Sequence, residues 1–214
     1  MNKTKILVDF AKQLGFSLRD FVLFYKDQKF KDTNLDKAVL FSNLLLDRLT
    51  KDEASYLSSK LNLPHKDNRT PIEYGKELVI SWLIEDIVSK YLILSANGAD
   101  AERDFLNESE IKYASDFLIN GRHLELYVSW TTYWTSVGKI DLRLDKYLNL
   151  LENRALLLGI SILDKKFFLM DFSKNDYGFQ QEYNLHWKKR CWTCRDYQDF
   201  IPIEKMHSVF ANFV

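Results

Sequence analysis

The chain has 214 residues, of which 46% are hydrophobic, so it can form one large domain, or one domain with a helical appendage, around a substantial core. Its 30 basic and 30 acidic residues cancel, so no global field steers it toward nucleic acid or an anionic membrane. Asp9 and Lys12 interrupt the apolar residues near the N-terminus, so this segment does not have the continuous apolar stretch of a signal peptide. No stretch of the chain is long and apolar enough to cross a membrane. We therefore predict a cytoplasmic protein without membrane contacts.

The first third of the chain is predicted to be helical. Over residues 4–62, apolar residues recur at helical spacing, as in Ile6, Leu7, Phe10 and Leu14. Residues 63–69, with a proline and several charges, have the composition of a linker. We expect a helical subdomain over residues 1–69 and a second region over residues 70–214.

A long helix is predicted to begin at Thr70-Pro71-Ile72-Glu73, which combines an N-cap residue, a proline at the first helical position and a capping-box glutamate. It continues to residue 91 and is apolar around most of its circumference, so it should be buried on more than one side. A short strand over residues 91–94 is expected to follow.

From residue 111 the apolar period changes to two, and Asn120-Gly121 separates two such runs, residues 111–119 and 122–130. Asn-Gly between alternating runs is the strongest short-range signal of a β-hairpin. A helix over residues 140–154 should follow, then strands over residues 155–162 and 165–172, joined over Leu163-Asp164-Lys165. The predicted fold class is α/β.

The turn at Asn120-Gly121 also sets the register of the hairpin, and it places Asp116 opposite Glu125. Apolar side chains such as Leu124 would then face the core, and the opposite face, which holds both carboxylates, would be the face of a site. Carboxylates directly opposite on a sheet have Cβ atoms roughly 4.5 to 5.5 Å apart, where like charges repel. Mg²⁺ would offset this repulsion; solvent exposure, or a bond from Arg122 or Lys112, is the alternative.

The order of these elements resembles the PD-(D/E)xK nucleases. The resemblance covers about residues 71–172: a buried helix beginning Gly75-Lys76-Glu77, a strand holding Asp116, a strand holding Glu125-Leu126-Tyr127, then a helix and a further strand. It implies a restriction-endonuclease-like mixed sheet flanked by helices. It also implies Mg²⁺-dependent hydrolysis of DNA phosphodiester bonds, with Mn²⁺ able to substitute.

The resemblance assigns roles to three acidic residues. Asp116 and Glu125 are the implied metal ligands, and Glu77 is the implied accessory acid on the preceding helix. Glu77 also belongs to a four-residue repeat with Glu73, Ser81 and Glu85, so it could instead lie on the solvated stripe of that helix.

The chain departs from the family at Tyr127, where the family has a lysine two residues after the second acid. A phenol with an ordinary pKa near 10 cannot supply a positive charge at neutral pH. Relocated lysines are known in this superfamily, and Lys139 or Lys146 is expected to take this role. Arg143 shares a helical face with Lys146 and is predicted to contact nucleic acid. A solvated basic stripe is the alternative for this face.

The tail contains the two cysteines of the chain, Cys191 and Cys194, in a CxxC spacing. One CxxC without a second cysteine pair is a weak zinc signal, and the expected context of a redox CxxC is missing. The two cysteines can therefore be interpreted as plain thiols, as part of a zinc site or as a redox pair.

The same tail interleaves basic and aromatic residues, which is typical of surfaces that contact phosphates and stack on bases. Those predicted to bind nucleic acid are Lys188, Lys189, Arg190 and Trp192. Core packing is the alternative account of the tryptophans.

These patterns together predict a metal-dependent DNA endonuclease of restriction-like type, in which the helical first third orients the duplex or forms a homodimer. A catalytically degenerate PD-(D/E)xK domain, which binds DNA or a protein without cutting, is the alternative because of Tyr127. A helical interaction module with a purely structural α/β half is a third hypothesis.

Overall fold

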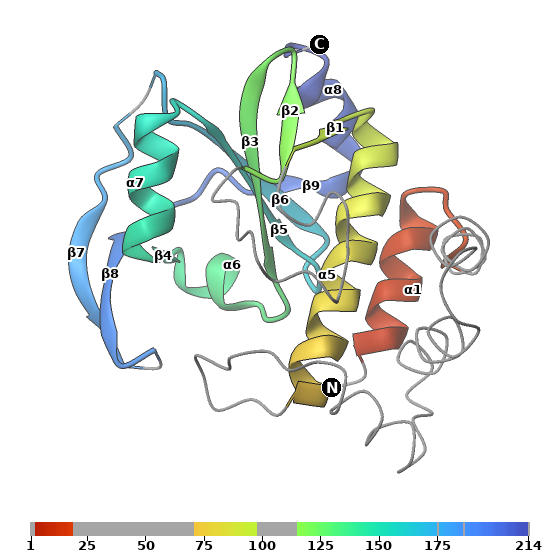
Figure 1. Ribbon diagram of the computed structural model, residues 1–214, viewed down its shortest axis with the longest axis horizontal. Helices are drawn as coiled ribbons and strands as arrows, with labels where there is room; N and C mark the ends of the chain where they lie inside the picture. Colours follow the sequence, from red (N-terminus) through yellow and green to blue (C-terminus); the bar gives the residue numbers. More distant parts are fainter. Residues whose placement is uncertain (1–2, 19–70, 98–114, 175, 186, 214) are drawn as a thin grey trace. The chain divides into compact units, whose positions relative to one another are not determined.

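The computed structural model describes residues 3–18, 71–97, 115–174, 176–185 and 187–213, without the side chains of residues 4 and 71–79. The chain divides into two compact units, residues 1–91 with 99–113, and residues 92–98 with 114–214. Figure 1 shows the described elements. Most of the helical subdomain predicted for residues 1–69 lies outside the described residues.

Two helices are described in the first unit. Helix α1 (Lys3–Gln13) buries one apolar stripe, which includes Leu7 and Phe10. Helix α5 (Pro71–Leu92) begins where the proline predicted it, and it buries consecutive residues at 82–84, so the expectation of burial on more than one side is confirmed. None of the described helices is long and apolar enough to cross a membrane.

The strand predicted over residues 91–94 is wrong. Helix α5 continues through Leu92, whose side chain is buried, and Ile93 then adopts a φ of 57°, in the left-handed region that ends a helix. Strand β1 (Ser95–Ala96) follows.

The second unit contains a mixed sheet with the order β1-β2-β3-β5-β6-β9 among the described strands. The strands beyond β1 are β2 (Phe117–Ile119), β3 (Arg122–Ser129), β5 (Leu156–Ser161), β6 (Lys166–Asp171) and β9 (Ile201–Pro202). Strand β3 runs parallel to β5, and the other neighbours are antiparallel. The prediction of an α/β fold with a mixed sheet and helices is confirmed, as are the strands expected over residues 155–162 and 165–172.

The register predicted for the central hairpin is also confirmed. Phe117 pairs with Leu124, and Ile119 pairs with Arg122, around a turn in which Asn120 and Gly121 have φ values of 48° and 77°. Both values are positive, as a two-residue type I′ turn requires. Residues 111–114, the start of the predicted first strand, lie outside the described residues.

The connection from β3 to β5 differs from the prediction of one helix over residues 140–154. It contains helix α6 (Tyr133–Val137), strand β4 (Ile140–Leu142) and helix α7 (Leu144–Glu152). Strand β4 is the edge of a second, antiparallel sheet with the order β4-β8-β7, where β7 is Gln180–Asn184 and β8 is Lys189–Cys194. Ile140 and Leu142 alternate with Asp141, which suits a strand paired to a distant partner. The chain ends with a 3-10 helix η3 (Ile203–Lys205) and helix α8 (Met206–Phe210).

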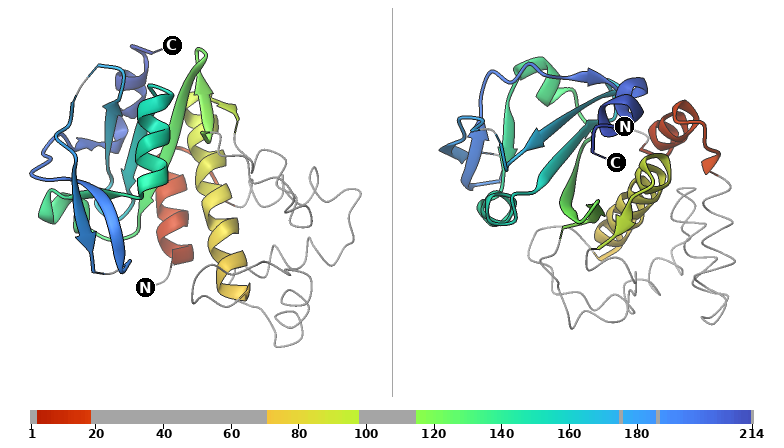
Figure 2. Two further views of the ribbon diagram at one scale, coloured as in Figure 1. Left: turned by 60° about the vertical axis from the view of Figure 1, so that its left-hand side comes forward. Right: turned by 90° about the horizontal axis from the view of Figure 1, so that it is seen from above.

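Helices α6 and α7 and the second sheet form a layer over one face of the mixed sheet (Figure 2). Buried aromatic and aliphatic side chains from both layers form one cluster. It includes Trp134, Leu142, Leu150, Leu157 and Phe168. This face of the mixed sheet, which was predicted to be the face of the site, is therefore covered in part by packed side chains. The opposite face is buried as well, as Leu124 and Ile160 show.

Gly159 makes room for this cluster. It pairs with Phe168 across the β5–β6 ladder and with Tyr127 across the β3–β5 ladder, and a Cβ atom at this position would collide with the Phe168 ring. Phe168 in turn packs edge-to-face on Trp134, with ring centroids 5.3 Å apart.

We expect Gly159→Ala to lower the free energy of unfolding by about 3 kcal/mol, because overpacking displaces a buried ring. Urea denaturation would measure the loss. The double variant Gly159→Ala, Phe168→Leu should recover part of the lost stability, since the shorter side chain relieves the collision. A single variant as stable as the wild type would contradict this packing.

Arg122, at the start of β3, holds Asp171, at the end of β6, through two hydrogen bonds of 3.2 and 2.6 Å. Burial alone would raise the pKa of the Asp171 carboxyl, but hydrogen bonds from Arg122 and Ser173 outweigh burial and lower the pKa from 3.8 to about 2. The contribution to stability is therefore present above pH 4 and is lost as the pH falls through 2.

We expect the wild type to lose about 2 kcal/mol of stability between pH 5 and pH 2 through this carboxyl, and Asp171→Asn to lack that part of the pH dependence. Urea denaturation as a function of pH would test it. Asp199→Asn, at an exposed aspartate, is the matched control and should behave like the wild type.

Candidate functional site

Glu125 is a buried carboxylate on β3. The residue is 9% exposed, and its Oε1 forms an ion pair with Nζ of Lys146 on α7, whose side chain is 20% exposed. The positive charge that offsets the repulsion expected between Asp116 and Glu125 is therefore supplied here by Lys146. This is one of the two lysines predicted to replace the lysine missing at position 127.

Asp116 directly precedes β2 and reaches across to β3. Its Oδ2 accepts a hydrogen bond of 2.7 Å from the backbone N–H of Leu126, the residue after Glu125. Its own backbone carbonyl accepts a bond of 3.0 Å from the backbone N–H of Asn97. The two acids predicted as metal ligands thus lie on adjacent strands, with the Asp116 carboxylate held beside the backbone of Glu125.

Tyr127 is part of the core cluster. Its ring lies 5.2 Å from that of Trp134, and its hydroxyl donates a hydrogen bond of 3.2 Å to the backbone carbonyl of Asp141. Burial raises the pKa of Tyr127 to about 12, so the phenol stays protonated at neutral pH. The Lys146 ammonium lies 5.7 Å from the Tyr127 ring centroid, within the range of a cation–π contact. The tyrosine ring therefore packs against the lysine that pairs with Glu125.

Lys139, the other lysine predicted to replace the one missing at position 127, contacts acidic residues of the second sheet. Its Nζ lies 3.4 Å from Asp141 and 3.3 Å from Glu182. Of the two lysines, Lys146 is the one that contacts a predicted metal ligand.

Asp141 is the centre of a polar cluster that the sequence analysis missed. Its carboxylate is buried and accepts hydrogen bonds from the Thr193 hydroxyl, at 2.6 Å, and the Asn184 amide, at 3.1 Å. Glu182 is in turn paired with Arg195. The alternation of Asp141 between two buried residues was the available signal, but it was interpreted as part of a helix.

A second missed feature is the contact of Ser115 with His123, at 2.8 Å between Oγ and Nδ1. The Ser115 hydroxyl also donates to the carbonyl of Phe117, and Asn97 donates to Ser115 at 3.3 Å. These contacts fix the chain on either side of Asp116. Strict alternation would place Ser115 and His123 on opposite faces of the hairpin, so the sequence carried no signal for this contact.

The other predicted residues are one glutamate of the first unit and, in the second unit, four basic residues and Trp192. Glu77 lies within α5, and its side chain is outside the described residues. Arg143 is exposed at the start of α7, with its Nε 3.8 Å from Asp145. Lys188, Lys189 and Arg190 are exposed around the start of β8.

Trp192 is half-buried, and the alternative account of core packing holds for it. One face of its indole stacks on Tyr147 of α7, with ring centroids 4.3 Å apart and an interplanar angle of 20°. This stacking covers a face that a nucleotide base would need.

Cys191 and Cys194 are buried free thiols on β8. Residues three apart on a strand point to opposite faces, and the two thiols have different partners: Cys191 contacts Asp141 at 3.7 Å, and Cys194 contacts the Tyr177 carbonyl at 3.2 Å. A zinc ion or a disulfide shared by both is therefore not compatible with this strand, and the interpretation as plain thiols is the one that fits.

The donor chemistry of Asp116 and Glu125 suits a hard divalent cation. Mg²⁺ binds through one or two protein carboxylates and completes its coordination with water and phosphate oxygens. Among the described side chains, no group of three or more His, Cys, Asp or Glu residues is arranged to hold a metal ion.

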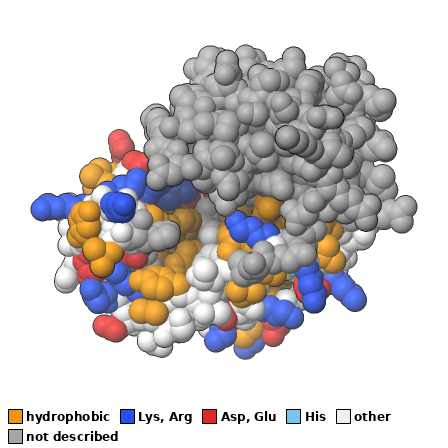
Figure 3. Space-filling view, turned by 90° about the horizontal axis from the view of Figure 1, so that it is seen from below, with side chains coloured by type: hydrophobic (Ala, Val, Ile, Leu, Met, Phe, Trp, Pro, Cys, Tyr) orange, Lys and Arg blue, Asp and Glu red, His pale blue; other side chains and the backbone are white. Residues whose placement is uncertain are grey.

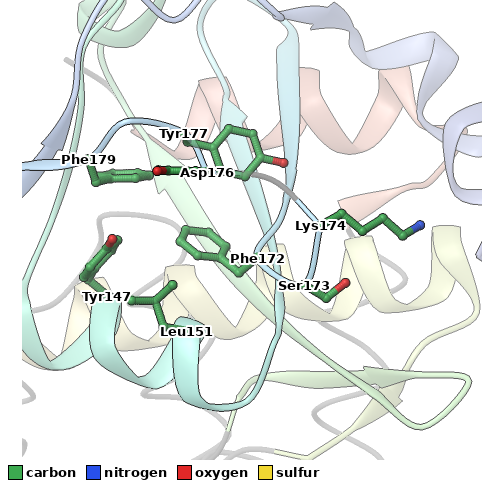
Figure 4. A pocket seen from close by; sticks show the side chains of 8 residues that line it. All are labelled: Tyr147, Leu151, Phe172, Ser173, Lys174, Asp176, Tyr177 and Phe179. Atoms are coloured by element: carbon green, nitrogen blue, oxygen red, sulfur yellow. The ribbon is translucent and has the colours of Figure 1, made fainter.

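A cavity of about 390 Å³ lies along α7 (Figure 4). Four of its eight lining residues are aromatic, Tyr147, Phe172, Tyr177 and Phe179, and the others include Ser173, Lys174 and Asp176. The Tyr147 and Phe179 ring centroids are 5.1 Å apart, so these rings pack on one another as well as lining the cavity.

No family model, no curated protein and no solved structure matches this chain.

We expect Lys146→Met to lower the free energy of unfolding by about 3 kcal/mol, because it leaves the buried Glu125 carboxylate without its counter-charge. The double variant Lys146→Met, Glu125→Gln should recover most of this loss, since the neutral amide needs no cation. Urea denaturation of the wild type, both single variants and the double variant forms a double-mutant cycle. A coupling energy near zero would contradict the ion pair.

Proposed function

We propose that this chain is a Mg²⁺-dependent DNA endonuclease of restriction-like type, in which Asp116 and Glu125 are the metal ligands and Lys146 supplies the positive charge of the site. The observation that supports the proposal most directly is the ion pair of Lys146 with Glu125. Glu125 stands in the middle of β3, with a lysine from helix α7 on its carboxylate, and the Asp116 carboxylate is held beside it by the backbone N–H of Leu126.

The arrangement of elements agrees with the proposal. Helix α5, strands β2 and β3, helix α7 and strand β5 come in the order expected from the resemblance to PD-(D/E)xK nucleases, with β1, α6 and β4 as additional elements between them. The parallel pairing of β3 with β5 joins the hairpin to the last strand of this series. The two acids stand on β3 and at the start of β2, as the resemblance implies.

In this mechanism each protein group has a separate task. When bound, Mg²⁺ supplies charge that stabilises the developing negative charge on the phosphate oxygens. Leu126 orients the Asp116 carboxylate through its backbone N–H. Lys146, held between Glu125 and the Tyr127 ring, can donate hydrogen bonds to a phosphate oxygen or to the attacking water. The buried Tyr127 phenol contributes packing and no charge.

The test is cleavage of supercoiled plasmid with Mg²⁺ or Mn²⁺, by the wild type and by variants. Asp116→Asn, Glu125→Gln and Lys146→Met should each slow nicking by about 100-fold or more. Lys146→Arg, which keeps the charge, should retain more activity than Lys146→Met. Lys139→Met is the matched control, because it removes a lysine paired with Asp141 and Glu182, and it should change the rate less than about threefold.

The second candidate function is a catalytically degenerate domain that binds DNA or a protein without cutting. The same ion pair favours it, because Lys146 neutralises Glu125 without any metal ion. Binding to plasmid, single-stranded and branched DNA without metal-dependent cleavage of any of them would establish this function and reject the nuclease. Equal nicking by the wild type and Glu125→Gln would reject the proposed site.

A further inference from the structure

The hairpin formed by β7 and β8 combines exposed apolar side chains with exposed cations at its tip. Tyr183 is 58% exposed and Leu185 is 82% exposed. Lys188, Lys189 and Arg190 are all exposed beside them. Figure 3 shows basic and hydrophobic side chains next to one another at its left-hand end, on the side where Figure 1 draws this sheet.

The register of the hairpin places these groups in defined positions. Tyr183 pairs with Arg190, and Asn184 pairs with Lys189. Side chains of paired residues share a face, and neighbouring pairs point to opposite faces. Tyr183 and Arg190 therefore lie on one face of the tip and Lys189 lies on the other, so cations flank the tip on both sides.

The tip cations differ from the other basic residues of this sheet. Lys139 and Arg195 are held by Glu182, and Lys139 also contacts Asp141. Residues 188–190 form no ion pair with any described side chain, and their charges are available to an anionic partner. A polyanion is a partner of complementary charge, even though the whole chain has a net charge of zero.

The position of Tyr183 indicates what kind of polyanion would fit. Trp192 lies on the same face two residues further along β8, but its indole already stacks on Tyr147. Tyr183 makes no ring contact with a described aromatic side chain and is more than half exposed to solvent. An aromatic ring can stack on a nucleotide base only when the base face is uncovered, and in a duplex the neighbouring base pairs cover it.

We propose that the tip of the β7–β8 hairpin binds an unpaired stretch of DNA, with the Tyr183 ring stacked on a base and residues 188–190 contacting the phosphates. This inference rests on the proposed nuclease only for the choice of nucleic acid as substrate. It predicts that the protein prefers DNA with a single-stranded region, such as an overhang or a flap, over a blunt duplex.

The experiment measures binding of the full chain to a fluorescein-labelled single strand and to a blunt duplex of the same sequence, by fluorescence anisotropy without divalent metal. Tyr183→Ala should weaken binding of the single strand about tenfold and leave binding of the duplex within twofold. Tyr183→Phe keeps the ring and should bind like the wild type. Tyr133→Ala, at a half-exposed tyrosine of α6, is the matched control and should also bind like the wild type.

The salt dependence separates the contribution of the cations. Lys189→Ala should reduce the slope of log Kd against log salt concentration by about 0.7, the value for one phosphate contact on a single strand. If Tyr183→Ala and Lys189→Ala both bind the single strand like the wild type, the proposal is wrong, and the tip is a solvated hairpin or a contact for another protein. Because no cleavage is measured, an inactive nuclease site would leave this result unchanged.

Discussion

The parallel pairing of β3 with β5 is the constraint on which the second unit depends. Two adjacent parallel strands cannot be joined by a tight turn, so the chain must cross over one face of the sheet before it returns. Helix α6, strand β4 and helix α7 form this crossover, and the core cluster beneath it closes that face. Lys146 reaches Glu125 because α7 crosses the sheet there. The ion pair is thus a consequence of the connection between two strands.

Much of this unit could be predicted from local signals. Asn120-Gly121 determined the turn, and the turn determined the register that sets Asp116 beside the strand of Glu125. The short and largely apolar run that forms β5 predicted a buried strand, and its residues are all buried. In each of these cases, neighbouring residues in the chain are also neighbours in space.

The features that were missed depend on contacts between distant segments. Strand β4 has three residues and pairs with β8, about fifty residues later, so nothing local separates it from the helix that follows. The sequence could not decide between Lys139 and Lys146 for the same reason. Lys139 is held by Asp141 and Glu182, and Lys146 is held by Glu125, through contacts that the local pattern does not reveal. Trp192 was assigned to a nucleic-acid surface because its stacking partner, Tyr147, lies on a helix that the pattern of the tail does not reveal.

The two cysteines have a practical consequence for experiments on this chain. Both thiols are almost completely buried, burial raises the pKa of each, and they face opposite sides of β8. Thiols of this kind react slowly with alkylating reagents and cannot form a disulfide with each other in the folded state. A cysteine introduced at an exposed position would therefore be labelled selectively, without removal of the native ones. Fluorophores or spin labels could then report on distances within the folded protein.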